Sequence, residues 1–149
     1  MENSFAKYPS LCGKNILITG GASGIGKEIV KGFAEQGANV AFLDLNYEAG
    51  ERLSSDIGEN VFFKKCDLKE VRNLKSSINK LRAQIGLFDV LVNNAAHDDR
   101  HNWEEVTEEY WDERFATNLR HQFFTIQSVA KDMIQKGGGS IVNIGSNSW

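Results

Sequence analysis

The stretch NILITGGASGIG at residues 15–26 constrains the fold of this chain more than any other. It joins a short apolar strand to a glycine-rich turn and the first turn of a helix. Gly20 lets the chain leave the strand in a backbone conformation that a Cβ would hinder, and Gly24 lets the main chain approach a pyrophosphate closely. Gly26 lets the helix pack near the sheet, and the free N–H groups at the helix start attract negative charge. The stretch predicts a phosphate-binding turn, although its Gly-x-x-x-Gly-x-Gly spacing differs from the commoner Gly-x-Gly-x-x-Gly.

Strand and helix patterns alternate along the rest of the chain. Apolar segments typical of buried parallel strands are at 16–19, 39–44, 61–66, 88–92 and 140–144. Apolar residues at helical spacing predict helices between them. This alternation predicts an α/β fold, a doubly wound parallel sheet (Rossmann fold) with strand order 3-2-1-4-5, because right-handed crossovers leave few other arrangements.

The helix boundaries are predicted from capping residues. Asn46 is a good N-cap for a helix that runs to about residue 57, and Asp67 with Glu70 has the spacing of a capping box. Thr107 is the predicted N-cap of the longest helix, which we expect to continue to Lys136. Asn118 lies inside that helix and is a poor helix former, which predicts a compensating tertiary hydrogen bond. Four large apolar residues along the same helix are expected to lie mainly in the core, with an oligomer interface as the alternative: Trp111, Phe115, Leu119 and Phe123.

Composition limits the classes of protein that this chain can represent. Its 149 residues predict one domain, and its apolar fraction of 41% with 25% charged residues is typical of a soluble globular protein. The net charge of −3 argues against nucleic acid or an anionic membrane as a partner. We find no secretory signal and no apolar run long enough for a membrane span. Cys12 and Cys66 have no metal-ligand spacing, which favours buried or free thiols in a reducing cytoplasm.

The chain ends at Trp149, directly after the fifth predicted strand. That strand would then be an apolar, unpaired edge, which proteins normally avoid. We therefore expect residues 1–149 to form a Rossmann domain that is incomplete at its C-terminal end and truncated after the fifth strand.

Asp44 ends the second strand, 18 positions after Gly26. In a dinucleotide fold, a carboxylate at this position accepts hydrogen bonds from the adenosine ribose hydroxyls. The same charge would repel the phosphate of NADP, and Ser23 in the turn supplies no compensating cation. The pattern favours NAD as the cofactor. The alternative is an ordinary Asp in a strand-to-helix turn.

Four ordered motifs resemble the short-chain dehydrogenase/reductase family over nearly the whole chain. The segment 19–26 is similar to the family's cofactor turn, Cys66-Asp67-Leu68 to its adenine-contacting Asp segment, and Asn93-Asn94-Ala95-Ala96 to its Asn-Asn-Ala-Gly segment. Ala96 replaces the usual glycine, so its methyl group must fit beside the cofactor. Asn118 matches the active-site Asn of the family, and Ser146 matches its catalytic Ser.

The resemblance implies a site in which a substrate carbon exchanges hydride with NAD. The implied cofactor-binding residues are Gly20, Ser23, Gly24, Ile25, Gly26, Asp44, Leu45, Asp67, Leu68, Asn94, Ala95 and Ala96. Ser146 would hold the reacting oxygen and Asn118 would help to position a relay water, while no metal is implied. The family's Tyr-x-x-x-Lys pair would fall beyond Trp149, since none of the three tyrosines precedes a Lys by four positions. We therefore expect this chain to be inactive alone.

Two further segments, 96–101 and 118–124, resemble an NAD-dependent branch that oxidises aldose sugars. A polar loop suits a sugar, since each desolvated hydroxyl needs a partner. Arg100, His101 and Ser148 are the candidate substrate contacts. Two alternatives remain open: a reductase of keto or oxoacyl substrates from the same family, and a non-catalytic NAD-binding module. The resemblance also implies that the parent protein is a homo-oligomer.

Overall fold

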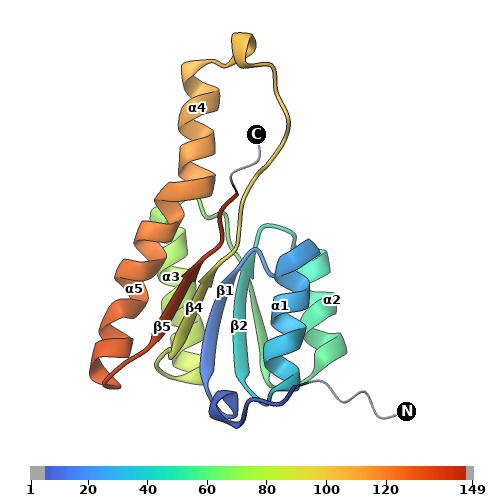
Figure 1. Ribbon diagram of the computed structural model, residues 1–149, viewed down its shortest axis with the longest axis vertical. Helices are drawn as coiled ribbons and strands as arrows, with labels where there is room; N and C mark the ends of the chain where they lie inside the picture. Colours follow the sequence, from blue (N-terminus) through green and yellow to red (C-terminus); the bar gives the residue numbers. More distant parts are fainter. Residues whose placement is uncertain (1–5, 147–149) are drawn as a thin grey trace.

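The structure is a computed structural model that describes residues 6–146. It contains a parallel sheet (Figure 1) in the order β3-β2-β1-β4-β5, which confirms the predicted order. The strands are β1 (Asn15–Thr19), β2 (Asn39–Asp44), β3 (Val61–Lys65), β4 (Val90–Asn93) and β5 (Ser140–Asn143). The helices are η1 (Pro9–Leu11), α1 (Gly24–Glu35), α2 (Tyr47–Ile57), α3 (Val71–Ile85), η2 (Trp103–Glu105), α4 (Glu108–Phe115), η3 (Ala116–Arg120) and α5 (His121–Gln135).

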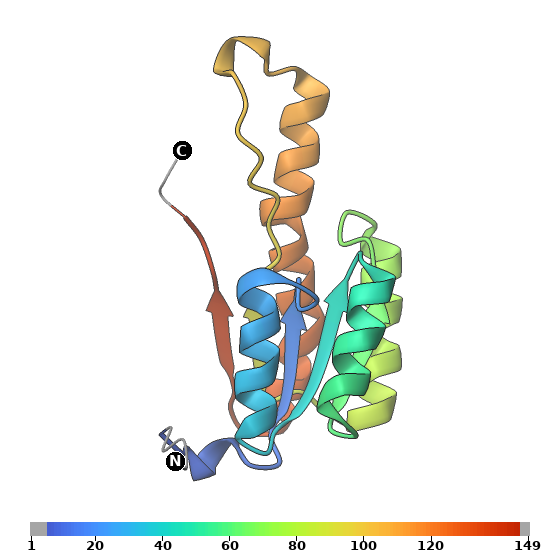
Figure 2. The same cartoon turned by 90° about the vertical axis from the view of Figure 1, so that its right-hand side faces the viewer.

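Helices cover both faces of this sheet, as expected for a Rossmann fold. Helices α1 and α2 lie on one face, and α3 and α5 lie on the other (Figures 1 and 2). Every residue of β1 is buried, and its side chains alternate between the two cores. Ile16 and Ile18 belong to the cluster under α1 and α2, whereas Leu17 belongs to the cluster under α3 and α5. Because β1 is central and buried on both faces, it holds the turn that follows it in a fixed position.

The predicted long helix from Thr107 to Lys136 is interrupted, which corrects the expectation of a continuous α-helix. Thr107 caps α4 as predicted, since its side chain accepts a hydrogen bond from Tyr110 N. A π-helix, η3, then separates α4 from α5. Two carbonyl groups of η3, those of Thr117 and Asn118, accept side-chain N–H groups from His121 and Gln122. Side-chain insertion of this kind is a recognised cause of a local change in helical winding.

The predicted capping box of α3 is wrong. The helix begins at Val71 with Glu70 at its N-cap, and no side chain makes a cap hydrogen bond there. The Asp67 carboxylate instead accepts a hydrogen bond from Lys69 N at 3.0 Å, inside the turn that precedes the helix. The Asp side chain therefore satisfies its own turn rather than the helix. Strand β4 also lies slightly later than predicted, at Val90–Asn93 rather than 88–92.

The four large apolar residues of the α4–α5 segment are not core residues, which corrects a further expectation. Trp111, Phe115, Leu119 and Phe123 have between 45% and 62% of their side chains exposed. The buried positions of this segment are instead Ala116, His121, Thr125, Val129, Asp132 and Met133. The spacing of five between Ala116 and His121 contains η3 and then gives way to the α-helical spacing of four. The π-helix thus sets which side of the segment faces the sheet.

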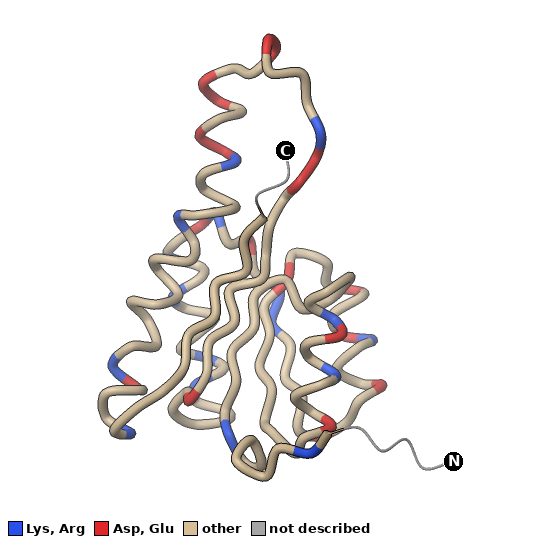
Figure 3. The backbone as a smooth tube through the Cα atoms, viewed as in Figure 1, with Lys and Arg blue, Asp and Glu red and all other residues tan. Residues whose placement is uncertain are grey.

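The segment 94–107 and helix α4 rise beyond the carboxyl ends of the strands in both views (Figures 1 and 2). Charged residues on this extension are mostly acidic, as the backbone tube in Figure 3 shows. Residues 98–113 contain eight carboxylates and one cation, Arg100. Within residues 6–146, no helix has both the length and the apolar character that crossing a bilayer requires.

Candidate functional site

The backbone of the turn between β1 and α1 leaves no room for a side chain at Gly20 or Gly26. Gly20 has a φ of +68°, and a Cβ there would lie 2.8 Å from the Cα of Ala95. A Cβ at Gly26 would lie 1.8 Å from the Gly20 carbonyl oxygen and 2.5 Å from Asn94 Nδ2. These contacts agree with the predicted roles of both glycines, because the chain, the helix and the loop after β4 meet here at backbone distance.

Gly24 differs from these two glycines because its surroundings are open. Its φ is +52°, yet a Cβ built there would meet no other described atom within 4 Å. Its neighbours Ser23 and Ile25 are also exposed. Ser23 is the N-cap of α1 and makes no side-chain cap hydrogen bond. The start of α1 therefore presents an accessible set of backbone N–H groups, a feature that attracts anions.

The loop after β4 is tied to the glycine turn by two side chains. The Asn94 carboxamide donates to the carbonyl oxygens of Thr19 and Gly20, at 3.2 and 3.0 Å. The Thr19 hydroxyl accepts hydrogen bonds from the backbone N–H groups of Asn94 and Ala95, both at 3.1 Å. The two segments therefore hold each other in position, and Ala95 and Ala96 follow directly at the edge of the turn.

Asp44 lies against the glycine turn, as the sequence predicts. One carboxylate oxygen accepts a hydrogen bond from Ala22 N at 2.9 Å, and the other accepts from Asn46 N at 2.9 Å. The side chain of the next residue, Leu45, is 61% exposed. A carboxylate has room for further donors after two such bonds. The structure thus places a negative charge beside the turn, at the carboxyl end of β2.

Two predicted cofactor-binding residues, Asp67 and Leu68, follow β3 and differ in burial. Asp67 is partly exposed and holds its own turn, whereas the side chain of Leu68 is buried in the core. The Leu68 side chain is therefore turned into the core, and a cofactor at this edge would meet only its backbone. The cofactor-binding roles of Asp67 and Leu68 stay predictions.

Asn118 lies in the middle of η3 and holds the chain beyond Ala96. Its side-chain oxygen accepts a hydrogen bond from His97 N at 2.7 Å, and its amide donates to the His97 carbonyl oxygen at 3.1 Å. This pair of bonds is the tertiary compensation that the sequence predicts for an Asn within a helix. The carboxamide of Asn118 is therefore a fixed point between the π-helix and the loop.

The remaining predicted site residues differ in how closely they approach this region. Ser146 is exposed and follows β5 at the carboxyl edge of the sheet, and Ser148 lies outside the described residues. Arg100 and His101 belong to the segment that rises away from the sheet. The His101 Nδ1 lies 2.8 Å from the Tyr110 hydroxyl, and the two rings are 4.9 Å apart. His101 is thus already held by α4.

Sequence reasoning gave no role to His121, although it is fully buried beside the turn. Its Nε2 lies 3.4 Å from the Thr19 hydroxyl, and its Nδ1 is bonded to the Thr117 carbonyl oxygen. A signal was available, because His121 starts a series at spacing four that continues with Thr125, Val129 and Met133. Such a series predicts a buried position, where a histidine needs hydrogen-bond partners.

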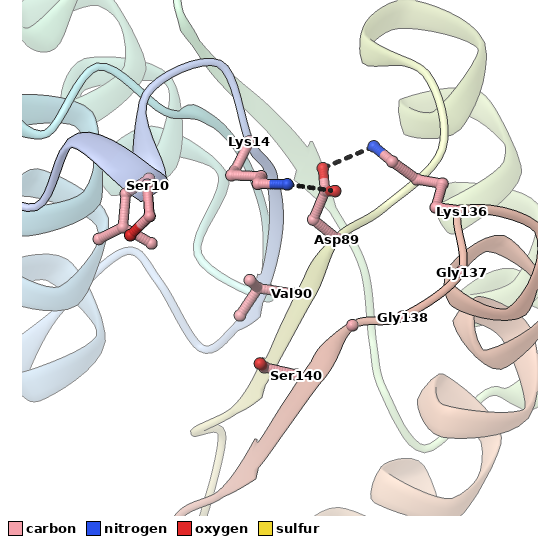
Figure 4. A pocket seen from close by; sticks show the side chains of 10 residues that line it. Ser10, Lys14, Asp89, Val90, Lys136, Gly137, Gly138 and Ser140 are labelled. Atoms are coloured by element: carbon pink, nitrogen blue, oxygen red, sulfur yellow. Dashed lines mark hydrogen bonds and ion pairs between the residues drawn. The ribbon is translucent and has the colours of Figure 1, made fainter.

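A hollow of about 410 Å³ lies at the opposite end of the sheet (Figure 4). It is bordered by Lys14, Asp89 and Lys136, and by the glycine segment that leads into β5. The Asp89 carboxylate is paired with both cations, at 3.4 Å to Lys14 Nζ and 2.7 Å to Lys136 Nζ. Asp89 also accepts a hydrogen bond from Asn15 N at 2.9 Å. The polar groups of this hollow therefore compensate one another, and we assign it a structural role.

Comparison with known proteins places nearly all of the described residues in one family. A family model described as short chain dehydrogenase matches residues 14–148. D-xylose 1-dehydrogenase of Caulobacter vibrioides (strain NA1000 / CB15N) is 48% identical over 149 residues, covering 98% of this chain and 58% of that protein. The probable galactose dehydrogenase GalD of Rhizobium meliloti (strain 1021) is 45% identical over 145 residues, covering 95% of this chain and 57% of that protein.

A solved structure gives the same result for the fold. The 3-ketoacyl-(acyl-carrier-protein) reductase from Brucella melitensis, complexed with NADH, has a TM-score of 0.85 and 28% sequence identity. The match covers 91% of this chain and 58% of that one. The chain therefore spans less than two thirds of the length of these relatives.

Proposed function

The chain belongs to the short chain dehydrogenase family, and from that premise we propose that its protein transfers hydride between NAD and a hydroxyl-bearing carbon of a sugar-like substrate. The observation that carries the choice of cofactor is the position of Asp44. Its carboxylate is bonded to Ala22 N within the glycine turn. An adenosine ribose at this turn would offer its hydroxyl groups to that carboxylate, whereas the additional phosphate of NADP would be repelled.

The residues that would hold the dinucleotide lie along one edge of the sheet. The diphosphate would rest on the backbone between Gly20 and Gly26, where the open space at Gly24 admits it. Asn94 and Ala95 would lie beside it because their segment is bonded to the turn. When bound, the nicotinamide ring supplies the hydride acceptor, and the chain supplies binding, orientation and electrostatics.

The catalytic groups proposed for this chain are Ser146 and Asn118. Ser146 would orient the reacting oxygen through its hydroxyl, and Asn118 would help to position a water beside the loop that it already holds. A proton acceptor is still needed for a hydroxyl substrate. No tyrosine in residues 1–149 precedes a lysine by four positions. We therefore propose that residues 1–149 bind the dinucleotide without turning over substrate.

A neutral, polar substrate suits the acidic extension formed by residues 98–113. Its eight carboxylates and one cation create a negative potential beside the carboxyl edge of the sheet. Such a potential disfavours an anionic substrate and leaves a neutral sugar unaffected. The relatives named for D-xylose and galactose agree with this choice. The likeness to a 3-ketoacyl reductase keeps a keto or oxoacyl substrate as the second candidate.

The exposed apolar residues of α4, η3 and α5 support assembly of the complete protein. Trp111, Phe115, Leu119 and Phe123 form this apolar set, and Trp111 stacks on Phe115 with ring centroids 4.6 Å apart. An exposed apolar set of this kind marks an interaction surface. We further propose that the complete protein is a homo-oligomer, with the exposed apolar side of α4, η3 and α5 at the interface.

Titration calorimetry with NAD and NADP tests the cofactor assignment on the chain itself. We expect NAD to bind at least about tenfold more tightly than NADP, a difference of about 1.4 kcal/mol. Asp44→Asn should reduce this preference, since it removes the charge that opposes the additional phosphate. Asp56→Asn removes an equal charge from an exposed position of α2 and serves as the control. Equal affinity for the two cofactors in the unmodified chain would contradict the assignment.

A further inference from the structure

His121 is the first residue of α5 and is fully buried, with both ring nitrogens bonded. The Thr117 carbonyl oxygen can only accept, so Nδ1 carries the ring proton that it bonds. Burial lowers the pKa of His121, against the opposing effect of the Thr117 hydrogen bond, so the ring is neutral at pH 7. In the neutral ring Nε2 is an acceptor, and the group within reach is the Thr19 hydroxyl at 3.4 Å.

This assignment fixes where the proton of the Thr19 hydroxyl points. The hydroxyl has one proton, which it donates to His121 Nε2, and two lone pairs, which face Asn94 N and Ala95 N at 3.1 Å. A donor in place of Nε2 would turn the hydroxyl proton toward those N–H groups. As an acceptor, His121 takes the hydroxyl proton and leaves both lone pairs of Thr19 directed at the loop after β4.

The same set of bonds reaches the glycine turn on one side and the π-helix on the other. Asn94, whose backbone is held by Thr19, donates from its side chain to the Gly20 carbonyl oxygen. His121 is anchored to Thr117, the neighbour of Asn118 in η3. The ring is thus the buried link between the segment that carries Asn118 and the two segments that would hold the cofactor.

We propose that His121 is a positioning residue for the dinucleotide: as a hydrogen-bond acceptor it orients the Thr19 hydroxyl, and through it the Asn94–Ala95 loop beside the glycine turn. The identity of the ligand, a dinucleotide, rests on the proposed function. The alignment of the Asn94–Ala95 loop by His121 does not depend on a bound cofactor. His121 would act through Thr19 and would not touch the dinucleotide.

Two replacements separate the acceptor from the bulk of the ring. His121→Leu fills the space and cannot accept a hydrogen bond, so NAD should bind about three- to tenfold more weakly, as expected for one neutral hydrogen bond. His121→Gln presents an amide oxygen to Thr19 and should restore most of the affinity. Thr125→Val removes a buried hydroxyl one helical turn away, which donates to Asn93 at 2.7 Å, and serves as the matched control. The control should lower the melting temperature without changing NAD affinity.

Amide hydrogen exchange tests the same role without any cofactor. In the unmodified chain, the N–H groups of Asn94 and Ala95 should be protected, and His121→Leu should lose this protection while β2 keeps it. His121→Gln should retain it. Unchanged protection and unchanged NAD affinity in a folded His121→Leu chain would overturn the proposal, as would failure of His121→Gln to restore either property. If the unmodified chain shows the expected protection but binds no NAD, the cofactor assignment fails and the alignment role of His121 stands.

Discussion

The two ends of the parallel sheet use their polar groups in different ways. At the amino end, the Asp89 carboxylate is surrounded by Lys14, Lys136 and the N–H group of Asn15. At the carboxyl end, side chains such as Thr19 and Asn94 bind backbone groups of neighbouring segments. The charges of the first end are paired with one another. The bonds of the second end hold the backbone in place around the accessible start of α1.

This difference is why we place the proposed cofactor site at the carboxyl end and not at the hollow near Asp89. The hollow of about 410 Å³ lies at the amino end, where charge compensation leaves little to attract a ligand. The carboxyl end has an open Gly24 and a carboxylate, Asp44, bonded to the same turn. In open α/β sheets ligands bind outside the carboxyl ends of the strands, and the proposed cofactor site lies at that edge.

The largest effect on NAD affinity is expected at the carboxyl end of the sheet, from Gly26→Ala. The added Cβ would lie 1.8 Å from the Gly20 carbonyl oxygen, so the backbone of the turn must move. Overpacking of this kind costs about 1–3 kcal/mol, and we expect NAD affinity to fall by at least about tenfold. Calorimetric titration measures the loss.

Gly32→Ala is the matched control for this change. Gly32 also lies in α1, but a Cβ there would meet no other described atom within 4 Å. Alanine should stabilise the helix by about 0.5–1 kcal/mol and leave NAD affinity unchanged. Equal affinities of the Gly26 and Gly32 variants would show that the turn is not the binding site.

At the amino end, Asp89→Ala should reduce stability without affecting NAD binding. The change leaves the buried N–H group of Asn15 without its acceptor, which costs about 1–3 kcal/mol. Urea denaturation at pH 7 measures the loss, with the exposed Asp56→Ala as the control. A fall in NAD affinity comparable to that of the Gly26 variant would break the distinction between the two ends.

The pH dependence of this loss has a definite sign. Burial acts to raise the pKa of Asp89, but the hydrogen bonds from Asn15 and Lys136 and the nearby cations outweigh it, so the pKa is lowered. A carboxylate with a lowered folded pKa stabilises the fold above its unfolded pKa, about 3.9, and this contribution is lost as the pH falls through the folded pKa. The stability difference between the unmodified chain and Asp89→Ala should therefore shrink on acidification below about pH 4. A difference that grows under acid would contradict this sign.

The smallest effect is expected on the pH dependence of stability, from the titration of His121. Burial lowers its pKa, so the unfolded chain takes up the proton first as the pH falls below about 6.5. The neutral ring therefore stabilises the fold above that pH, and its contribution is lost below it. Its two bonded partners, a carbonyl and a hydroxyl, do not titrate. Urea denaturation between about pH 5 and 7.5, the range in which histidine titrates, measures this contribution. The free energy of unfolding of His121→Gln should depend less steeply on pH than that of the unmodified chain, and an unchanged slope would contradict the burial argument.

The sequence predicts the central part of this fold well because its signals are local. Apolar strands, the glycine turn and the caps at Asn46 and Thr107 depend on neighbouring residues, and the structure confirms them. Right-handed connections then leave the observed strand order as the expected one. The proximity of Asp44 to the turn follows from the register of β1 and β2, which pairs Thr19 with Leu43.

The features that sequence reasoning missed depend on partners far away in the chain. The π-helix accompanies the bonds between Asn118 and His97, which are 21 positions apart. The link between His121 and Thr19 spans 102 positions. The exposure of Trp111 and Phe123 could not be predicted from periodicity, because an apolar series fixes a helix face but does not state what covers it.

The most direct test is to map which residues NAD contacts when it binds to the chain. With ¹⁵N-labelled protein, titration of NAD should shift the amide resonances of residues 20–26 and 94–96 first and most strongly. The amides of residues 136–140, which border the amino-end hollow, should stay unchanged. Shifts centred on residues 136–140, or no shifts at residues 20–26 at saturating NAD, would contradict the assignment of the cofactor to the carboxyl edge of the sheet.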